Sequence, residues 1–112
     1  MKVAVVGSRN FNDYEKLKQT LDQTPDITRI ISGGAKGADA LAEQWAKEKG
    51  IEIVVYKPDW AKYGRGAGVV RNRLIIEDCD YCIAFWDGVS KGTKSSIEHS
   101  KKMHKGLLVV RY

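Results

Sequence analysis

The sequence lacks any apolar run that approaches the ~20 residues a membrane-spanning helix needs. Its amino-terminal stretch has one lysine and a short apolar segment ending at Gly7, which is too little for a secretory signal. We therefore expect a cytoplasmic protein without a membrane partner.

Cysteine is scarce: Cys79 and Cys82 are the only two, spaced C-x-x-C. Redox pairs of this spacing usually open a helix, whereas this pair falls between a helix end and an apolar strand. Two thiols are also too few for a zinc site unless His99 or His104 joins them. We interpret them as unreactive thiols and expect no metal, although their role at a dimer interface stays open.

Two familiar nucleotide motifs are missing. The pattern G-x-x-x-x-G-K-[ST] does not occur, and no G-x-G-x-x-G follows the first apolar run. An ordinary P-loop NTPase and an ordinary NAD dehydrogenase are both disfavoured.

What is present suits one compact domain over residues 1–112, with 43% apolar residues and 112 residues in all. Residues 1–56 carry 8 basic and 8 acidic side chains, while residues 57–112 carry 11 and 6 and so hold the whole net charge of +5. A basic half suits a polyanionic or phosphorylated partner. The alternative for the lysines near residue 102 is a solvated helix face.

Five short apolar runs, rich in β-branched and aromatic residues, predict strands. Most lack strict alternation, as expected for strands covered on both faces. They are Val3–Val6, Ile27–Ile31, Ile51–Tyr56, Tyr81–Trp86 and Leu107–Val110.

Helical patterns lie between these runs. Asn12 is the predicted cap of the first helix, with Glu15 completing a capping box. The second is expected over about 37–49 and ends at Gly50. The third should cover about 67–77 with Val70 and Leu74 inward, and the fourth should run from about residue 93 to before Gly106.

Alternating strands and helices predict an α/β fold, a Rossmann-like three-layer sandwich of about five parallel strands with helices on both faces. By analogy with Rossmann halves we expect strand order 3-2-1-4-5. A ligand would then bind beyond the carboxyl ends of the strands, where that order reverses.

Three predicted strands end in glycine-rich polar segments, 7–10, 32–39 and 87–95, which should meet at one edge of the sheet. The segment 32–39 carries glycines at 33, 34 and 37, together with Ala35 and Lys36, directly before a helix. Glycine permits close approach of a ligand, and a helix amino terminus favours an anion. We favour a phosphate cradle over a tight turn whose glycines serve packing.

Several side chains near these segments could contact a ligand. Arg9 could fork onto phosphate, and Arg71 and Asn72 could turn toward the crevice from the third helix; exposed surface is the alternative for each. Asp39 could accept from ribose hydroxyls, although Asp in a first helical turn often serves only the helix dipole. Asp87 ends an apolar strand and is the better ribose candidate.

Trp60 and Tyr63 follow the third predicted strand. Either aromatic ring could stack on a base, although aromatic side chains more often belong to the core. Position alone leaves both alternatives open.

Four stretches together resemble the SLOG superfamily, the Rossmann-like group that contains the DNA-processing protein DprA and the cytokinin-activating LOG enzymes. They are Gly7-Ser8-Arg9, SGGAKGADALAEQWA at 32–46, AGVVRNRLI at 67–75 and FWDGVSKGTKSSI at 85–97. They occur in the family's order, and the closest resemblance is to the small stand-alone YspA-like, YpsA-related branch.

The resemblance implies a nucleotide or nucleic-acid ligand, held by Gly7, Ser8 and Arg9, by Gly33, Gly34, Gly37 and Asp39, by the Arg71-Asn72 pair and by a Gly92-Thr93 phosphate loop. To these matched positions our reading of the residues adds Ala35, Lys36, Asp87 and Ser95. An ADP-ribose-like molecule is one ligand the family suggests.

One departure concerns catalysis. LOG enzymes carry a glutamate in the last loop, and Ser96 stands at that position here. Glu98 lies a helical rotation of about 200° away and should point elsewhere. LOG-type phosphoribohydrolase activity is disfavoured, and no catalytic residue is identified, although Asp39, Asp87 or Glu43 could supply an acid.

Three functions remain open. The chain could be a binding module that senses or sequesters a nucleotide-like molecule, a hydrolase that cleaves one, or a single-stranded DNA-binding protein like DprA. Relatives in the family commonly self-associate, so we expect a homodimer or a larger homo-oligomer.

Overall fold

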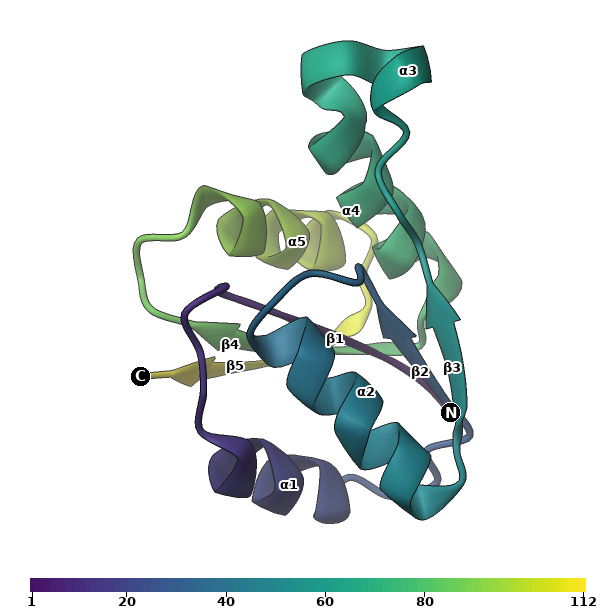
Figure 1. The fold of residues 1–112 in the computed structure, drawn as a ribbon, viewed down its shortest axis with the longest axis vertical. Coiled ribbons are helices and arrows are strands. Elements are labelled where there is room, and N and C mark those ends of the chain that lie inside the picture. The colour runs from purple at the N-terminus through teal and green to yellow at the C-terminus, as the bar shows by residue number, and fades with distance from the viewer.

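The computed structural model describes residues 1–112 as a five-stranded parallel sheet between two layers of helices (Figure 1). The strands are β1 (Lys2–Gly7), β2 (Arg29–Ser32), β3 (Glu52–Val55), β4 (Tyr81–Trp86) and β5 (Gly106–Arg111). The helices are α1 (Tyr14–Asp22), α2 (Ala38–Lys49), α3 (Trp60–Tyr63), α4 (Ala67–Asp78) and α5 (Lys91–Lys102), with a 3-10 turn η1 (Gly64–Gly66). The sheet order β3-β2-β1-β4-β5 confirms the predicted Rossmann-like arrangement. No helix has both the length and the apolar character needed to span a bilayer.

The central strand β1 feeds two hydrophobic cores, one on each face of the sheet. Successive side chains of a strand point to opposite faces. Val3 and Val5 therefore pack against α1 and α2, whereas Ala4 and Val6 pack against α4 and α5. Every one of these four side chains is at most 6% exposed. Burial on both faces explains why the strand sequences do not alternate.

Two details of the predicted helices were wrong. The cap of α1 is Asp13 and not Asn12, because Asp13 Oδ1 accepts a hydrogen bond from the Lys16 amide at 3.1 Å. On α4 the buried face differs from the predicted one, because Ile75 and Ile76 are buried, whereas Leu74 is 37% exposed. The sequence AGVVRNRLIIED offers several apolar stripes, and packing against α5 and the sheet selects one of them.

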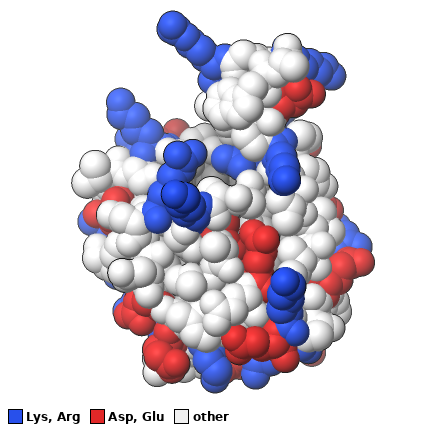
Figure 2. Space-filling view, in the orientation of Figure 1, with Lys and Arg blue, Asp and Glu red and all other residues white.

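The segment after β3 that carries Trp60 and Tyr63 contains the short helix α3 and the turn η1. Asp59 caps α3 by accepting from the Lys62 amide at 3.1 Å. This segment projects from the body above α4 (Figure 1), and Lys and Arg side chains gather around its base (Figure 2).

Both cysteines are buried and unpaired. Burial raises the pKa of the Cys79 thiol to about 11 and that of Cys82 to about 12. Both thiols are therefore protonated at neutral pH and shielded from reagents, as expected of unreactive core side chains.

The last strand brings Tyr112 next to the loop that follows β1. The Tyr112 hydroxyl donates to Asn10 Oδ1 at 2.7 Å, and its ring meets Phe11 edge-on at 4.9 Å between centroids. Phe11 in turn stacks on Phe85 at 4.8 Å. This aromatic cluster fixes the β1–α1 loop against the carboxyl edge of the sheet.

Candidate functional site

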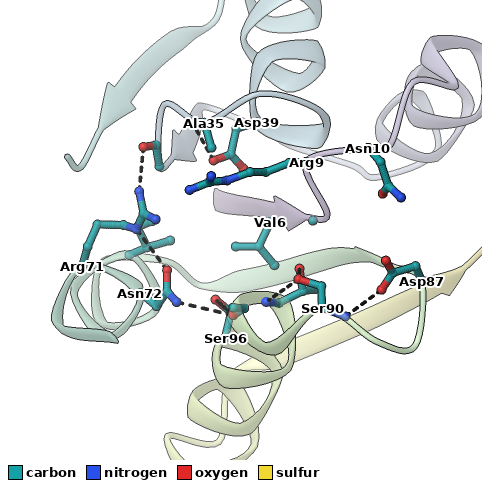
Figure 3. A pocket seen from close by; sticks show the side chains of 15 residues that line it. Val6, Arg9, Asn10, Ala35, Asp39, Arg71, Asn72, Asp87, Ser90 and Ser96 are labelled. Atoms are coloured by element: carbon teal, nitrogen blue, oxygen red, sulfur yellow. Dashed lines mark hydrogen bonds between the residues drawn. The ribbon is translucent and has the colours of Figure 1, made fainter. Parts of the chain in front are cut away.

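A crevice of about 460 Å³ opens at the carboxyl edge of the sheet, where the strand order reverses (Figure 3). It lies between the β1–α1 loop, the β2–α2 loop, α4 and the amino terminus of α5. The predicted site residues that line it are Gly7, Arg9, Gly33, Ala35, Asp39, Arg71, Asn72, Asp87, Gly92 and Thr93. The structure thus brings together residues from all four stretches that the sequence singled out.

The β2–α2 loop is shaped by its own hydrogen bonds. Ser32 Oγ accepts from the Gly34 amide at 3.1 Å and donates to Glu43 on α2 at 2.9 Å. The Asp39 carboxylate accepts from the Ala35 amide at 3.1 Å. These bonds fold the loop back over the first turn of α2, whose N-cap Gly37 offers no side chain to the helix.

Gly37 joins two of the loops. Its φ is +79°, and a Cβ at this position would collide with the backbone carbonyls of Ser8 and Arg9. Only a glycine lets the β2–α2 loop and the β1–α1 loop approach this closely. Gly37 therefore allows the two loops beside the crevice to pack together, but it does not itself line the crevice.

Arg71 links α4 to the β2–α2 loop. Its Nη1 donates to the Gly33 carbonyl at 2.7 Å, and its Nε donates to Asn72 Oδ1 at 3.0 Å. Asn72 Nδ2 then donates to the Gly92 carbonyl at 3.4 Å. A Cβ on Gly33 would lie 2.6 Å from Arg71 Nη1, so the glycine makes room for the guanidinium.

Asp39 is the buried carboxyl of the crevice, 7% exposed. Burial raises its pKa to about 6, against the opposing effects of the Ala35 amide and the Arg71 guanidinium. Burial also lowers the pKa of Arg71, and the neighbouring charge of Arg9 adds to this effect. In Figure 3, Arg9 reaches across the crevice below Asp39 toward Arg71. The two guanidinium groups thus concentrate positive charge beside one carboxyl that titrates near pH 6.

The opposite wall of the crevice is formed by the β4–α5 loop and the first turn of α5. Ser90 caps this helix, its Oγ accepting from the Thr93 amide at 3.4 Å. Asp87 accepts from the Ser90 and Val89 amides at 2.8 and 2.9 Å, and these bonds hold its pKa below its ordinary value. The Asp87 carboxylate is therefore already engaged by its own loop.

Five predicted site residues do not line the crevice. Ser8 is buried beneath it and its hydroxyl has no partner, Gly37 lies behind it, and Lys36 is exposed and lines no hollow. Gly34 and Ser95 line a second hollow of about 470 Å³ that adjoins the first. Trp60 also lines that second hollow, whereas Tyr63 does not.

Sequence reasoning missed Asn10 and Ser90, which line the crevice. Ser90 lies three residues before Thr93, a spacing typical of a helix cap that could have identified it. Ser96 also lines the crevice, buried, with its hydroxyl 3.4 Å from the Gly92 carbonyl. Glu98 is exposed and lies outside the crevice, as expected. No cluster of three metal-ligating side chains occurs in the structure.

Comparison with known proteins gave a family and a relative. The model of the YAcAr family, described as the YspA, cpYpsA-related SLOG family, matches residues 1–63. The Gene 61 protein of Mycobacterium phage D29 is 31% identical over 121 aligned residues, covering 99% of this chain and 95% of that protein.

Two solved structures share the fold. DNA processing protein A (DprA) of Streptococcus pneumoniae has a TM-score of 0.82 at 19% identity, covering 96% of this chain and 49% of its own. DprA of Helicobacter pylori, described by its single-stranded DNA binding mode, has a TM-score of 0.74 at 24% identity, covering 97% and 64%. The present chain thus spans about half to under two thirds of these longer proteins.

Proposed function

Because the chain belongs to the YspA, cpYpsA-related SLOG family, we propose that its crevice binds a nucleotide or a nucleotide-derived molecule. The ligand carries phosphate and ribose, as an ADP-ribose-like molecule does. The protein then acts in the cytoplasm as a sensor or a sequestering module for that ligand.

One observation carries this proposal: two helix amino termini and two guanidinium groups converge on one polar crevice. Asp39 lies in the first turn of α2, and Gly92 and Thr93 lie in the first turn of α5. Unpaired amides at helix starts and the side chains of Arg9 and Arg71 all favour an anion. A phosphate group matches this set of donors better than a neutral ligand does.

The side chains that line the crevice have different roles in the proposed binding of the ligand. Arg9 makes no ion pair and no side-chain hydrogen bond within the chain, so its guanidinium is free to fork onto a phosphate. Arg71 is held by Gly33 and Asn72 and presents its remaining donors in a fixed direction. Asp39 is the acceptor for ribose hydroxyls, since the Asp87 carboxylate is bound by its own loop.

Single-stranded DNA is the second candidate ligand. The fold shared with DprA, one example of which is described as binding single-stranded DNA, favours it, and so does the net charge of +5. A nucleic acid would bring its phosphates to the same crevice. Its binding would weaken steeply with added salt and strengthen with oligonucleotide length.

Turnover is the remaining alternative. A hydrolase needs a group that donates or accepts a proton near neutral pH, and Asp39, with its pKa of about 6, is the one crevice carboxyl with that property. Release of free base or ribose phosphate, lost in Asp39→Asn, would establish an enzyme in place of a binding module.

A panel of nucleotides, NAD derivatives, ADP-ribose forms and short oligonucleotides tests the proposal by thermal shift and calorimetry. A ligand at 100 times its Kd should stabilise the fold by about 2.7 kcal/mol. Arg9→Ala should weaken binding about tenfold, which corresponds to one charge-assisted contact. Lys36→Ala is the matched control, because Lys36 lies in the same region and lines no hollow.

Equal affinity in the wild type and Arg9→Ala would contradict the site, and the absence of any stabilising nucleotide would contradict the function. Light scattering on the same samples tests the expected homodimer.

A further inference from the structure

The second hollow differs from the first in its charge. It is lined by the cationic side chains of Arg9, Arg65, Arg71 and Lys91 and by no Asp or Glu. The first crevice sets Arg9 and Arg71 against Asp39 and Asp87. Figure 2 shows Lys and Arg side chains gathered at the hollowed surface below the projecting α3 segment. We name this second space the Trp60 hollow, after the aromatic side chain at its rim.

Trp60 is 60% exposed, the largest exposed fraction of any aromatic side chain among the exposed hydrophobic residues. Its neighbour Tyr63 is also exposed, but the ammonium of Lys62 already lies 5.1 Å from the centre of its ring. Trp60 is therefore the aromatic side chain that lines the hollow, and no cation of the chain lies over its ring. An exposed aromatic ring beside cations is the arrangement on which nucleic-acid bases stack.

Three of the four cations of the Trp60 hollow are also unpaired. Arg9, Arg65 and Lys91 form no salt bridge with any carboxylate of the chain, and none of the three donates a side-chain hydrogen bond. The carboxylate of the α3 segment, Asp59, does not line this hollow and accepts from the Lys62 amide. Around Arg65 and Lys91, positive charge therefore accumulates without a paired carboxylate.

The two hollows share a wall. Gly33, Ala35, Asn72 and Gly92 line both, together with Arg9 and Arg71. A single bound ligand can therefore extend from one hollow into the other. Each hollow has a volume within the range of small-ligand sites, so each has room for a separate part of that ligand.

We infer that the ligand contains two nucleotide units joined through phosphate, and that the Trp60 hollow holds the second unit. Its base stacks on Trp60, and its phosphate lies between Arg65 and Lys91. This inference rests on the proposed binding of the first unit in the crevice. A short single strand of DNA and a dinucleotide with two bases joined through a pyrophosphate, as in NAD, both supply this chemistry.

Two series of ligands test it: thymidine 5′-monophosphate, the dinucleotide pTpT and an eight-nucleotide strand of thymidine in one, and AMP and NAD in the other. The wild type should bind a ligand with a second unit about tenfold more tightly than the matching mononucleotide, as one base stack contributes. Trp60→Ala and Arg65→Ala should each abolish that gain and leave the affinity for the mononucleotide unchanged. Tyr63→Ala and Lys62→Ala, on the same segment but outside the hollow, should keep both affinities.

The outcomes separate this inference from the proposed function. If the mononucleotide binds through Arg9 and the second unit adds nothing, the inference is wrong and the proposed function stands. Equal loss of both affinities in Trp60→Ala would also overturn it, because the segment would then act on the fold. If none of these ligands binds, both fail. A gain confined to pTpT and the longer strand identifies a nucleic acid, and a gain confined to NAD identifies a small dinucleotide.

Discussion

The β2–α2 loop and the β4–α5 loop carry the same sequence signal, which is glycine near the start of a helix. Individual glycines in these loops nevertheless have different surroundings. In the first, Gly33 accommodates Arg71 and Gly37 packs on the Ser8–Arg9 backbone. In the second, a Cβ on Gly92 would meet nothing within 4 Å. Glycines at one edge therefore cannot be interpreted alike: Gly33 and Gly37, like Gly88 against Arg111, serve close packing, whereas Gly92 leaves open space for a ligand.

The carboxylates of the two loops differ in the same way. Asp39, after β2, is buried and its pKa is raised to about 6. Asp87, after β4, is held by two amides of its own loop and its pKa is lowered. Protonation changes on the first wall as the pH passes 6, whereas the second wall stays anionic throughout that range.

The largest effect should come from Gly37→Ala. The new Cβ requires a side chain at φ +79° and meets the carbonyls of Ser8 and Arg9, which cannot move away without shifting the loop. We expect a loss of about 3 kcal/mol in the free energy of unfolding, from backbone strain and overpacking together. Urea denaturation measures it; a loss below about 1 kcal/mol would show that the two loops are not held together here.

Asp39→Asn should change the pH dependence of stability. The native pKa of about 6 lies above the ordinary 3.8, so between about pH 4 and pH 6 the folded state keeps a proton that the unfolded state has lost. The free energy of unfolding of the wild type should therefore fall as pH rises through this window, by about 2 kcal/mol.

The neutral amide that the Asp39→Asn variant carries has no charge to bury, so the pH profile of that variant should be flat in the same range, as followed by chemical denaturation at each pH. Asp87→Asn is the contrasting control. The lowered native pKa of Asp87 adds stability at neutral pH that is lost only as the pH falls below about 4. Parallel profiles of unfolding free energy against pH for the wild type and Asp39→Asn would contradict the raised pKa of Asp39.

Gly33→Ala should separate binding from folding. Its Cβ meets the side-chain ends of Arg71 and Asp39 and not the backbone, so the fold should lose less than about 1 kcal/mol. Displacement of the guanidinium should weaken nucleotide affinity about tenfold. Calorimetry on this variant and on Arg71→Ala should give similar losses; full affinity in Gly33→Ala would place the ligand away from Arg71.

The smallest effect, of opposite sign, is expected for Gly92→Ala. The position is in the first turn of α5 with free space around it, so alanine should stabilise the helix by about 0.5 kcal/mol. A ligand that approaches the backbone there should nevertheless bind more weakly. Thermal melts with and without ligand distinguish the two effects, and a destabilised apo protein would show that this loop is as closely packed as the other.

Much of the fold followed from local patterns. The apolar runs placed the strands within two residues of their observed ends, and their alternation with helices predicted the parallel sheet. The order of the strands, expected by analogy with Rossmann halves, was also confirmed. The misjudged positions, the cap at Asp13 and the inward face of α4, depended on which of two adjacent candidates the tertiary packing selects. Local sequence carries little information about that choice.

The candidate site was predictable where strand ends converge, because a parallel sheet gathers them at one edge. The pairing of Arg71 with Gly33, 38 positions apart, was not, because it depends on how α4 lies across the sheet. The separate roles of Trp60 and Tyr63 were equally hidden, since the short helix α3 turns one ring to the hollow and the other to Lys62. A substitution at Gly34 would be a poor test of ligand binding, because the φ of +70° at this position would strain any side chain placed there.

The contact between Tyr112 and Asn10 has a practical consequence for handling the protein. Any peptide joined after residue 112 leaves the body beside the crevice, since Asn10 lines it. Met1 lies at the opposite edge, where its amino group donates to the Asp26 carbonyl. An affinity handle or surface-coupling group at the amino end therefore leaves the crevice mouth clear, whereas one at the carboxyl end competes with whatever enters it.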